Sequence, residues 1–130
     1  MKLLTLFLLM FVTFFCILSL KAEAPKDQTL SIQDYIGVYS FVYDVPVATL
    51  SSVIACESSF NPNAENITER EASFGLSQIN LLAHRHISKE EALDPKYAIK
   101  FMAENISKGK GNMWKTCYGK AVEERGITLP

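Results

Sequence analysis

The sequence predicts an all-α or mostly α fold, built as one small domain behind an N-terminal apolar segment. Apolar residues recur at helical spacing, Ser, Asp and Pro stand where helices would begin, and no segment alternates as a strand would. A chain of 130 residues that is 48% apolar has room for one core of this kind. Its formal net charge of −1 offers no attraction to a polyanion, so we expect no nucleic-acid partner.

The first 24 residues have the composition of an export signal. Lys2 precedes an apolar run at 3–20, and Ala22 and Ala24 are small residues of the type that signal peptidase requires. The run is also nearly long enough to span a membrane, and Pro25 directly follows the expected cut. The sequence therefore leaves open whether residues 1–24 are removed or kept as a membrane anchor. Residues 25–30 are expected to be a short linker, and the domain to occupy residues 31–130.

Two helices are predicted at the start of the domain. Ser31 is a good N-cap for the first helix, whose apolar face consists of Ile32, Tyr35, Ile36, Tyr39 and Val42. Asp44 and Pro46 combine a capping side chain with a residue tolerated in a first turn, so a second helix is predicted over residues 47–57. Its buried face is expected to consist of Val47, Leu50, Val53 and Ile54.

The middle of the chain lacks a long helical pattern. Residues 58–75 are rich in Asn, Pro, Ser and charged residues without periodicity, which indicates a loop. Residues 76–86 are interpreted as a short helix.

Helix signals return in the last third of the chain. Ser88 and Glu91 form a capping box, and Asp94 with Pro95 marks a second start within a helical segment that ends at Gly109. A last helix is predicted over residues 112–124.

Glu57 is the candidate catalytic residue, because it falls at the C-terminal end of the second helix. The helix dipole and apolar neighbours both disfavour a negative charge there, so we expect the pKa of this carboxyl to be raised. A raised pKa is what a general acid requires. Glu65, Glu69 and Glu71 lie in the predicted loop and are interpreted as solvated charges.

Two of the three cysteines, Cys56 and Cys117, lie outside the apolar N-terminal run. An even number in an exported protein permits a disulfide, although two buried apolar cysteines would give the same pattern. The sequence alone leaves both readings open. His84 and His86 form only half of a metal site, so we expect no metal and no cofactor.

Four motifs stand in a recognisable order: "ESSFNPNA" from Glu57, "SFGLSQIN" from Ser73, "DPKYAIKFMA" from Asp94 and "WKTCYGKA" from Trp114. In this order they resemble the lytic transglycosylase catalytic domain of the lysozyme superfamily, of the SLT-like type. The resemblance covers nearly all of the chain after the export segment and implies a single lysozyme-like domain.

The resemblance also implies a site. Glu57 takes the place of the only essential catalytic acid, and Gln78 and Asn80 take the place of residues that line the sugar groove. Ser58, of the same Glu-Ser pair, and Tyr118, which matches the tyrosine that hydrogen-bonds near the acid, are also expected to bind the substrate. The neighbours of Tyr118 depart from the family pattern. Because Cys56 and Cys117 directly precede Glu57 and Tyr118, the resemblance brings them close and favours a disulfide.

The function implied is a lytic transglycosylase that cleaves peptidoglycan glycan strands, in the periplasm or cell envelope, either secreted or anchored in the inner membrane. Such a small enzyme would suit local opening of the wall for a secretion, conjugation or phage assembly. A hydrolytic lysozyme on the same fold and a non-catalytic wall-binding or assembly protein remain as alternatives. A membrane would be contacted only through the N-terminal segment.

Overall fold

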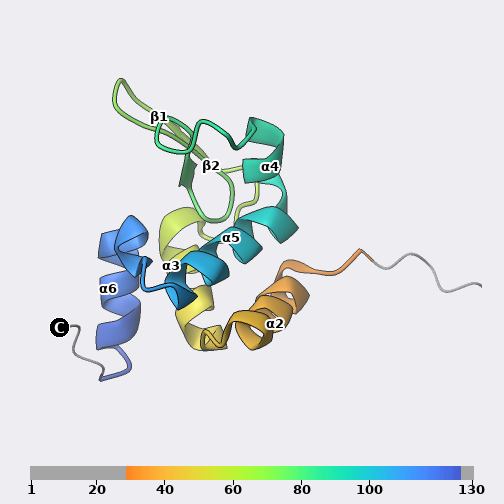
Figure 1. The fold of residues 1–130 in the computed structure, drawn as a ribbon, viewed down its shortest axis with the longest axis vertical. Coiled ribbons are helices and arrows are strands. Elements are labelled where there is room, and N and C mark those ends of the chain that lie inside the picture. The colour runs from red at the N-terminus through yellow and green to blue at the C-terminus, as the bar shows by residue number, and fades with distance from the viewer. Residues whose placement is uncertain (1–28, 127–130) are drawn as a thin grey trace, which may run out of the picture.

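A computed structural model describes residues 29–126, so the predicted export segment lies outside the described residues. The described chain is mostly helical, as predicted, with one small sheet at one end of the helical body (Figure 1). Within residues 29–126, no helix is long and apolar enough to cross a membrane. The elements are α2 (Ile32–Tyr43), α3 (Val47–Ser58), β1 (Glu65–Ile67), β2 (Ala72–Phe74), β3 (Ile79–Asn80), α4 (Lys89–Leu93), α5 (Pro95–Ser107), the 3-10 helix η1 (Gly111–Trp114) and α6 (Lys115–Glu123).

The first two helices occur where they were predicted, but their junction differs. Ser31 caps α2 in a reciprocal capping box with Asp34. The expectation that Asp44 caps α3 is wrong: Asp44 ends α2 in the left-handed conformation, with φ of 53°, and its N–H donates to the Ser40 carbonyl. The N-cap of α3 is Pro46, which makes no side-chain cap bond. Asp is among the few residues that adopt this conformation readily, and that allows a turn of only three residues.

The structure contains a three-stranded antiparallel sheet in the order β1-β2-β3, which the sequence did not predict. The predicted loop at 58–75 includes the hairpin β1–β2, and the predicted short helix at 76–86 is wrong, because these residues form β3 and turns. Strands of two or three residues are too short to show an alternating pattern. Their stability comes from pairing and from packing of the sheet on α4.

Contacts between the hairpin and α4 hold the sheet in place. Lys89 of α4 forms an ion pair with Glu65 at 2.8 Å, and its Nζ lies 4.8 Å from the centre of the Phe74 ring. Gly75 follows β2 with φ of 73°, and a Cβ there would lie 1.9 Å from the carbonyl oxygen of Ala92. This close approach requires glycine.

The helices of the last third begin where the capping signals predicted. Ser88 and Glu91 form a capping box at α4, and the Asp94 carboxylate accepts hydrogen bonds from the backbone N–H groups of Lys96 and Tyr97 at the start of α5. The predicted last helix is present as η1 followed by α6.

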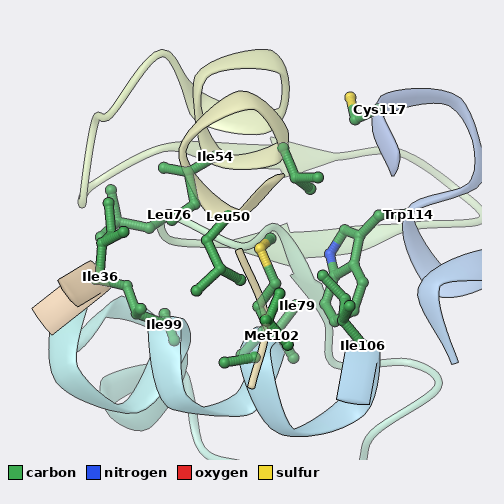
Figure 2. Packing of buried hydrophobic residues seen from close by; sticks show 14 of the residues in the cluster. Ile36, Leu50, Ile54, Leu76, Ile79, Ile99, Met102, Ile106, Trp114 and Cys117 are labelled. Carbon is green, nitrogen blue, oxygen red and sulfur yellow. The ribbon is translucent and has the colours of Figure 1, made fainter. Parts of the chain in front are cut away.

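The core lies around α5, with α2 packed on α5 and α3 packed on α6. Figure 2 shows Leu50 and Ile54 of α3 above Ile99 and Met102 of α5, and all four side chains are fully buried. Val42 and Val47, expected on the buried faces, are instead 59% and 51% exposed. Both lie near helix ends at the α2–α3 junction, where the neighbouring helices no longer cover them.

Candidate active site

Glu57 lies in the last turn of α3, as expected, and its side chain is partly buried. The helix ends abruptly, because Ser59 and Phe60 both adopt left-handed conformations with φ of 51° and 62°. The N–H of Ser59 donates to the Ala55 carbonyl and closes the last turn. The chain then leads into the hairpin, whose first strand begins at Glu65.

The pKa of Glu57 is raised, and the expected direction is therefore confirmed. Burial is the larger cause, because removal from water disfavours the charged form. The negative charge of Glu71 is the second cause, and the sequence did not indicate it. A carboxyl in these surroundings keeps its proton at higher pH than an ordinary glutamate and can donate it to a bound molecule.

The raised pKa of Glu57 predicts how this residue affects the stability of the protein at different pH values. The folded chain holds the Glu57 proton more tightly than the unfolded chain, so the contribution of Glu57 to the free energy of unfolding falls as pH rises above the ordinary value of 4.5. Glu57→Gln removes the carboxyl and therefore this decrease in the free energy of unfolding. We expect the variant to melt at a higher temperature than the wild type at pH 7 and at the same temperature below about pH 4. Thermal unfolding across this pH range tests it, and an equal difference at all pH values would contradict it.

Glu71 is not the solvated loop charge that the sequence suggested. It is partly buried, and each of its carboxylate oxygens accepts a hydrogen bond: Oε1 from the Ser73 hydroxyl at 2.6 Å and Oε2 from the Asn66 amide at 3.2 Å. Glu65 and Glu69 are exposed, as expected. No pattern in the sequence marks Glu71, because only the hairpin brings it near the end of α3.

A cavity of about 230 Å³ lies beside β3, and two of the predicted substrate-binding residues line it. The Gln78 amide donates to the carbonyls of Gly75 at 3.0 Å and Ala64 at 3.3 Å. The Asn80 Oδ1 accepts from the N–H groups of Leu82 at 3.0 Å and Ala72 at 3.5 Å. Both side chains are thus oriented by backbone groups. The full lining is Gln78, Ile79, Asn80, Ala83, His84, Phe101, Met113 and Trp114.

The far wall of this cavity is aromatic, and the sequence did not indicate it as a site. His84 packs edge-on against Phe101 with ring centres 5.2 Å apart, and Phe101 packs in the same way on Trp114. The pKa of His84 is lowered by burial and by the charges of His86 and Lys110, so this ring is neutral at pH 7. Aromatic and amide groups around a small cavity suit a sugar, which has apolar faces and hydroxyl edges. No group of metal-binding side chains occurs in the described residues.

Glu57 does not line this cavity, but the sheet connects the cavity to Glu71. Ala72, whose N–H is bound to Asn80 Oδ1, directly follows Glu71 in the chain. Ser73, the donor to Glu71, is the pairing partner of Asn80 in the sheet. Glu71 and the cavity are therefore joined through one short strand.

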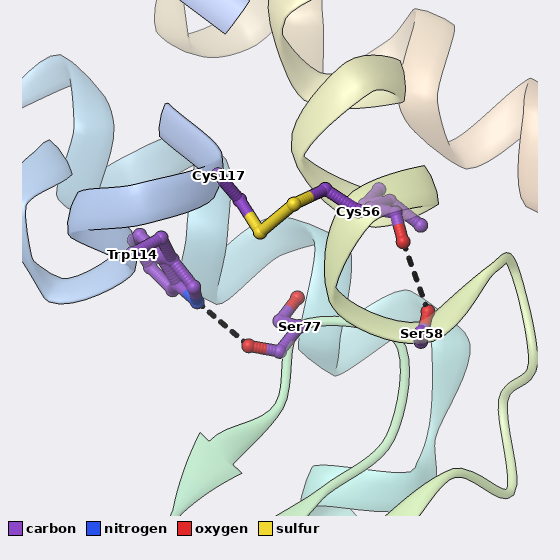
Figure 3. The surroundings of a disulfide bond; sticks show 6 residues. Cys56, Ser58, Ser77, Trp114 and Cys117 are labelled. Carbon is purple, nitrogen blue, oxygen red and sulfur yellow. Dashed lines mark hydrogen bonds between the residues drawn. A yellow bond between two sulfur atoms is a disulfide. The ribbon is translucent and has the colours of Figure 1, made fainter. Parts of the chain in front are cut away.

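The predicted disulfide between Cys56 and Cys117 is confirmed, with Cα atoms 5.6 Å apart (Figure 3). It joins the last turn of α3 to the first turn of α6, directly next to Glu57. In the same region, the Trp114 ring N–H donates to the Ser77 carbonyl at 2.7 Å (Figure 3). These two links hold η1 and α6 against the last turn of α3 and against the segment that carries Gln78. Trp114 itself is buried.

Ser58 and Tyr118 are placed differently from the other predicted site residues. The Ser58 hydroxyl donates to the Ile54 carbonyl of its own helix at 3.1 Å (Figure 3). Tyr118 packs against Gly111, where a Cβ would lie 2.4 Å from its ring, and it lines a second cavity. That cavity contains none of Glu57, Gln78 and Asn80. The structure brings together Gln78 and Asn80 in one cavity, which Glu57, Ser58 and Tyr118 do not line.

A comparison with protein-family models matches the part of the chain that contains the candidate site. A family model described as "Transglycosylase SLT domain" matches residues 34–119, a range that runs from α2 into α6 and contains every residue discussed above as part of the site. Comparison with curated proteins found no match, and comparison with solved structures found none either.

Proposed function

We propose that this chain, which belongs to the transglycosylase SLT domain family, is a peptidoglycan lytic transglycosylase with Glu57 as its catalytic acid. The observation that carries the proposal is the state of Glu57: a partly buried carboxyl with a raised pKa at the end of α3. The bond cleaved is the β-1,4 bond from N-acetylmuramic acid to N-acetylglucosamine. Gln78 and Asn80 bind and orient the sugars in the cavity beside β3.

The reaction needs one carboxyl group acting twice. Glu57 first donates its proton to the glycosidic oxygen as the bond from that oxygen to C1 of the muramic acid breaks. The resulting carboxylate then takes the proton of the C6 hydroxyl, whose oxygen bonds to C1. The product is a 1,6-anhydro sugar, Glu57 is protonated again, and no water is consumed. The substrate thus supplies the nucleophile for which other glycosidases use water or a second carboxylate.

Mass analysis of muropeptides tests this function. Purified peptidoglycan is digested with the protein, and the products should carry anhydro ends, each lighter by one water than a reducing end. Reducing ends would instead indicate a hydrolytic lysozyme. Binding of the glycan without any product would indicate a wall-binding or assembly protein.

The hydrolytic alternative has one observation in its favour. Hydrolysis with a single displacement requires a second carboxylate that activates water, and Glu71 is a second carboxylate near the acid. Both of its oxygens are already hydrogen-bonded within the hairpin, however, which favours a fixed charge over a group that takes up a proton.

Gln78→Ala provides a prediction for the binding role. The variant should weaken activity by raising KM, and it should lose less activity than Glu57→Gln, because Gln78 orients the sugar and transfers no proton. Kinetics on soluble glycan strands measure the effect. Ser58→Ala is the matched control and should change KM little, because its hydroxyl is bound to its own helix. A loss in Gln78→Ala as large as that in Glu57→Gln would contradict the assignment.

The proposal includes export to the periplasm or cell envelope, where peptidoglycan is present, with or without a retained N-terminal anchor. The Cys56–Cys117 disulfide supports an oxidising compartment. Within the envelope, the enzyme would open the wall locally for a secretion, conjugation or phage assembly. Deletion of the gene should then impair that assembly without changing the growth of the cell.

A further inference from the structure

The outer side of α2 carries apolar residues that the core does not cover. Val38, Phe41 and Val42 are spaced three and four residues apart, so they lie on one side of the helix, and all three are exposed. Val47, at the start of α3, is exposed as well, and Phe41 is 90% exposed. The outer side of a surface helix is normally polar, and a group of exposed apolar side chains marks an interaction surface. These four residues are called the exposed apolar face below.

The second cavity, which Tyr118 lines, begins where α2 ends. It has a volume of about 330 Å³, and the residues that connect Val42 to Val47 form part of its wall. Figure 1 shows α2 and its junction with α3 at the end of the helical body opposite the sheet. The cavity shares no lining residue with the cavity beside β3. A cavity of about 150 Å³ already holds a benzene ring, so this one has room for a phenylalanine side chain. The apolar part of its wall consists of Val45, Pro46, Ile106 and Val122.

Arg125 supplies a positive charge at this cavity. Its Nη1 donates to the Thr49 hydroxyl at 2.7 Å, and Thr49 is buried, so the guanidinium is held at the wall. Asp44 lines the same cavity. Within residues 29–126, no ion pair joins Asp44 to Arg125. Both charges are therefore available to a molecule that brings the opposite charge.

A lipid bilayer does not suit this surface. Helices that lie on membranes carry Lys or Arg beside their apolar residues, because anionic headgroups attract these cations. α2 contains neither Lys nor Arg, and its charged residue is Asp34. Asp44 adds a second negative charge where the helix ends. The exposed apolar face therefore suits a protein partner.

We propose that this partner is a second copy of the chain, in a two-fold dimer in which Phe41 of each protomer enters the cavity of the other. A two-fold interface requires one surface to carry both complementary parts. This surface does so twice: it combines an exposed phenylalanine with a cavity, and the carboxylate of Asp44 with the guanidinium of Arg125. Aromatic side chains that fill pockets contribute most of the binding energy in such interfaces. The inference does not rest on the proposed function, since neither Glu57 nor the cavity beside β3 takes part.

Photo-cross-linking of the full chain in detergent tests which surface Phe41 contacts. Phe41 is replaced by the photoreactive analogue p-benzoylphenylalanine, and unlabelled chains are equilibrated with nitrogen-15-labelled chains before irradiation. Mass spectrometry should find peptides that join position 41 to the segments carrying Ile106 and Val122, with one labelled and one unlabelled member. Only contact between two chains produces such mixed pairs. The same analogue in place of Ile67, which is 65% exposed on β1, is the matched control and should give no mixed pairs.

Sedimentation equilibrium measures how strongly the chains associate. Phe41→Ser should raise the dissociation constant of the dimer roughly tenfold or more, and Ile67→Ser should leave it unchanged. Asp44→Asn should raise it less and make the association less sensitive to salt, because it removes one charge of the pair. Asn also adopts the left-handed conformation of Asp44. All variants keep the N-terminal segment, so any association through it affects them equally. Thermal unfolding checks that each variant is folded, as expected for replacements of exposed side chains.

Three results would overturn the inference. The first is a wild type that sediments as a monomer at every concentration. The second is a Phe41→Ser variant that associates as strongly as the wild type. The third is a set of cross-links from position 41 that reach only detergent or the same chain, which would assign the exposed apolar face to a membrane or to a different protein. Glycan cleavage does not enter these measurements, so they succeed or fail independently of the proposed function.

Discussion

Replacing Glu57 by Gln is expected to lower glycan cleavage by about 10²–10⁴-fold while leaving the fold and glycan binding intact. The amide keeps the shape of the side chain but has no acidic proton to donate to the leaving oxygen. Release of soluble muropeptides measures the cleavage, and co-sedimentation with insoluble peptidoglycan measures the binding. Because the carboxyl is partly buried with a raised pKa, its replacement by a neutral group should not destabilise the protein at pH 7.

Glu69→Gln is the control for this loss, since it removes one exposed carboxylate elsewhere in the chain. It should retain wild-type cleavage. Retention of more than about a tenth of wild-type turnover in Glu57→Gln would end the assignment of Glu57 as the general acid, because the smallest typical loss is about 10²-fold.

Replacing both Cys56 and Cys117 by Ser is expected to have the largest effect on stability. The disulfide closes a loop with a sequence separation of 61, and on the chain-entropy model its loss costs about 4 kcal/mol. For a domain of this size, that corresponds to a fall in Tm of roughly 15–30 °C. Cleavage should fall as well, because the bridge holds α6 against the turn of α3 that carries Glu57. Calorimetry of the wild type and the double variant measures the change.

A reducing agent provides the matched control. It should lower the Tm of the wild type toward that of the double variant and leave the double variant unchanged. Thiol titration of the denatured, unreduced protein checks the bond directly: free Cys56 and Cys117 would contradict it. An unchanged Tm in the double variant would show that the bridge adds nothing to the core.

The helices and their starting points could be predicted from sequence because each is specified locally. Ser31, Ser88 and Asp94 cap the helices that follow them, as the spacing of polar and apolar residues indicated. Glu57 could be recognised for a related reason, since its position at a helix end follows from the same pattern. The resemblance to the transglycosylase domain then supplied the pairing of Cys56 with Cys117, which spacing alone left open.

The sheet and the second carboxylate could not be predicted in this way. The strands are two or three residues long, and they are formed by pairing across the hairpin instead of by any periodic pattern in the chain. In the sequence, Glu71 is indistinguishable from the loop residues Glu65 and Glu69. Only the folded hairpin distinguishes it, because Ser73 and Asn66 donate hydrogen bonds to its carboxylate. The placement of Tyr118 against Gly111 likewise depends on how η1 meets α6.

By itself, the sequence determined the helical class, the ends of most helices and the position of Glu57 at a helix end, because capping and helical periodicity act over a few neighbouring residues. Tertiary structure alone decided the surroundings of these residues: it let burial and the charge of Glu71 raise the pKa of Glu57, and it placed Gln78 and Asn80 in a cavity with His84 and Phe101. The physical reason is that burial and charge interactions depend on distances in space between residues far apart in the chain.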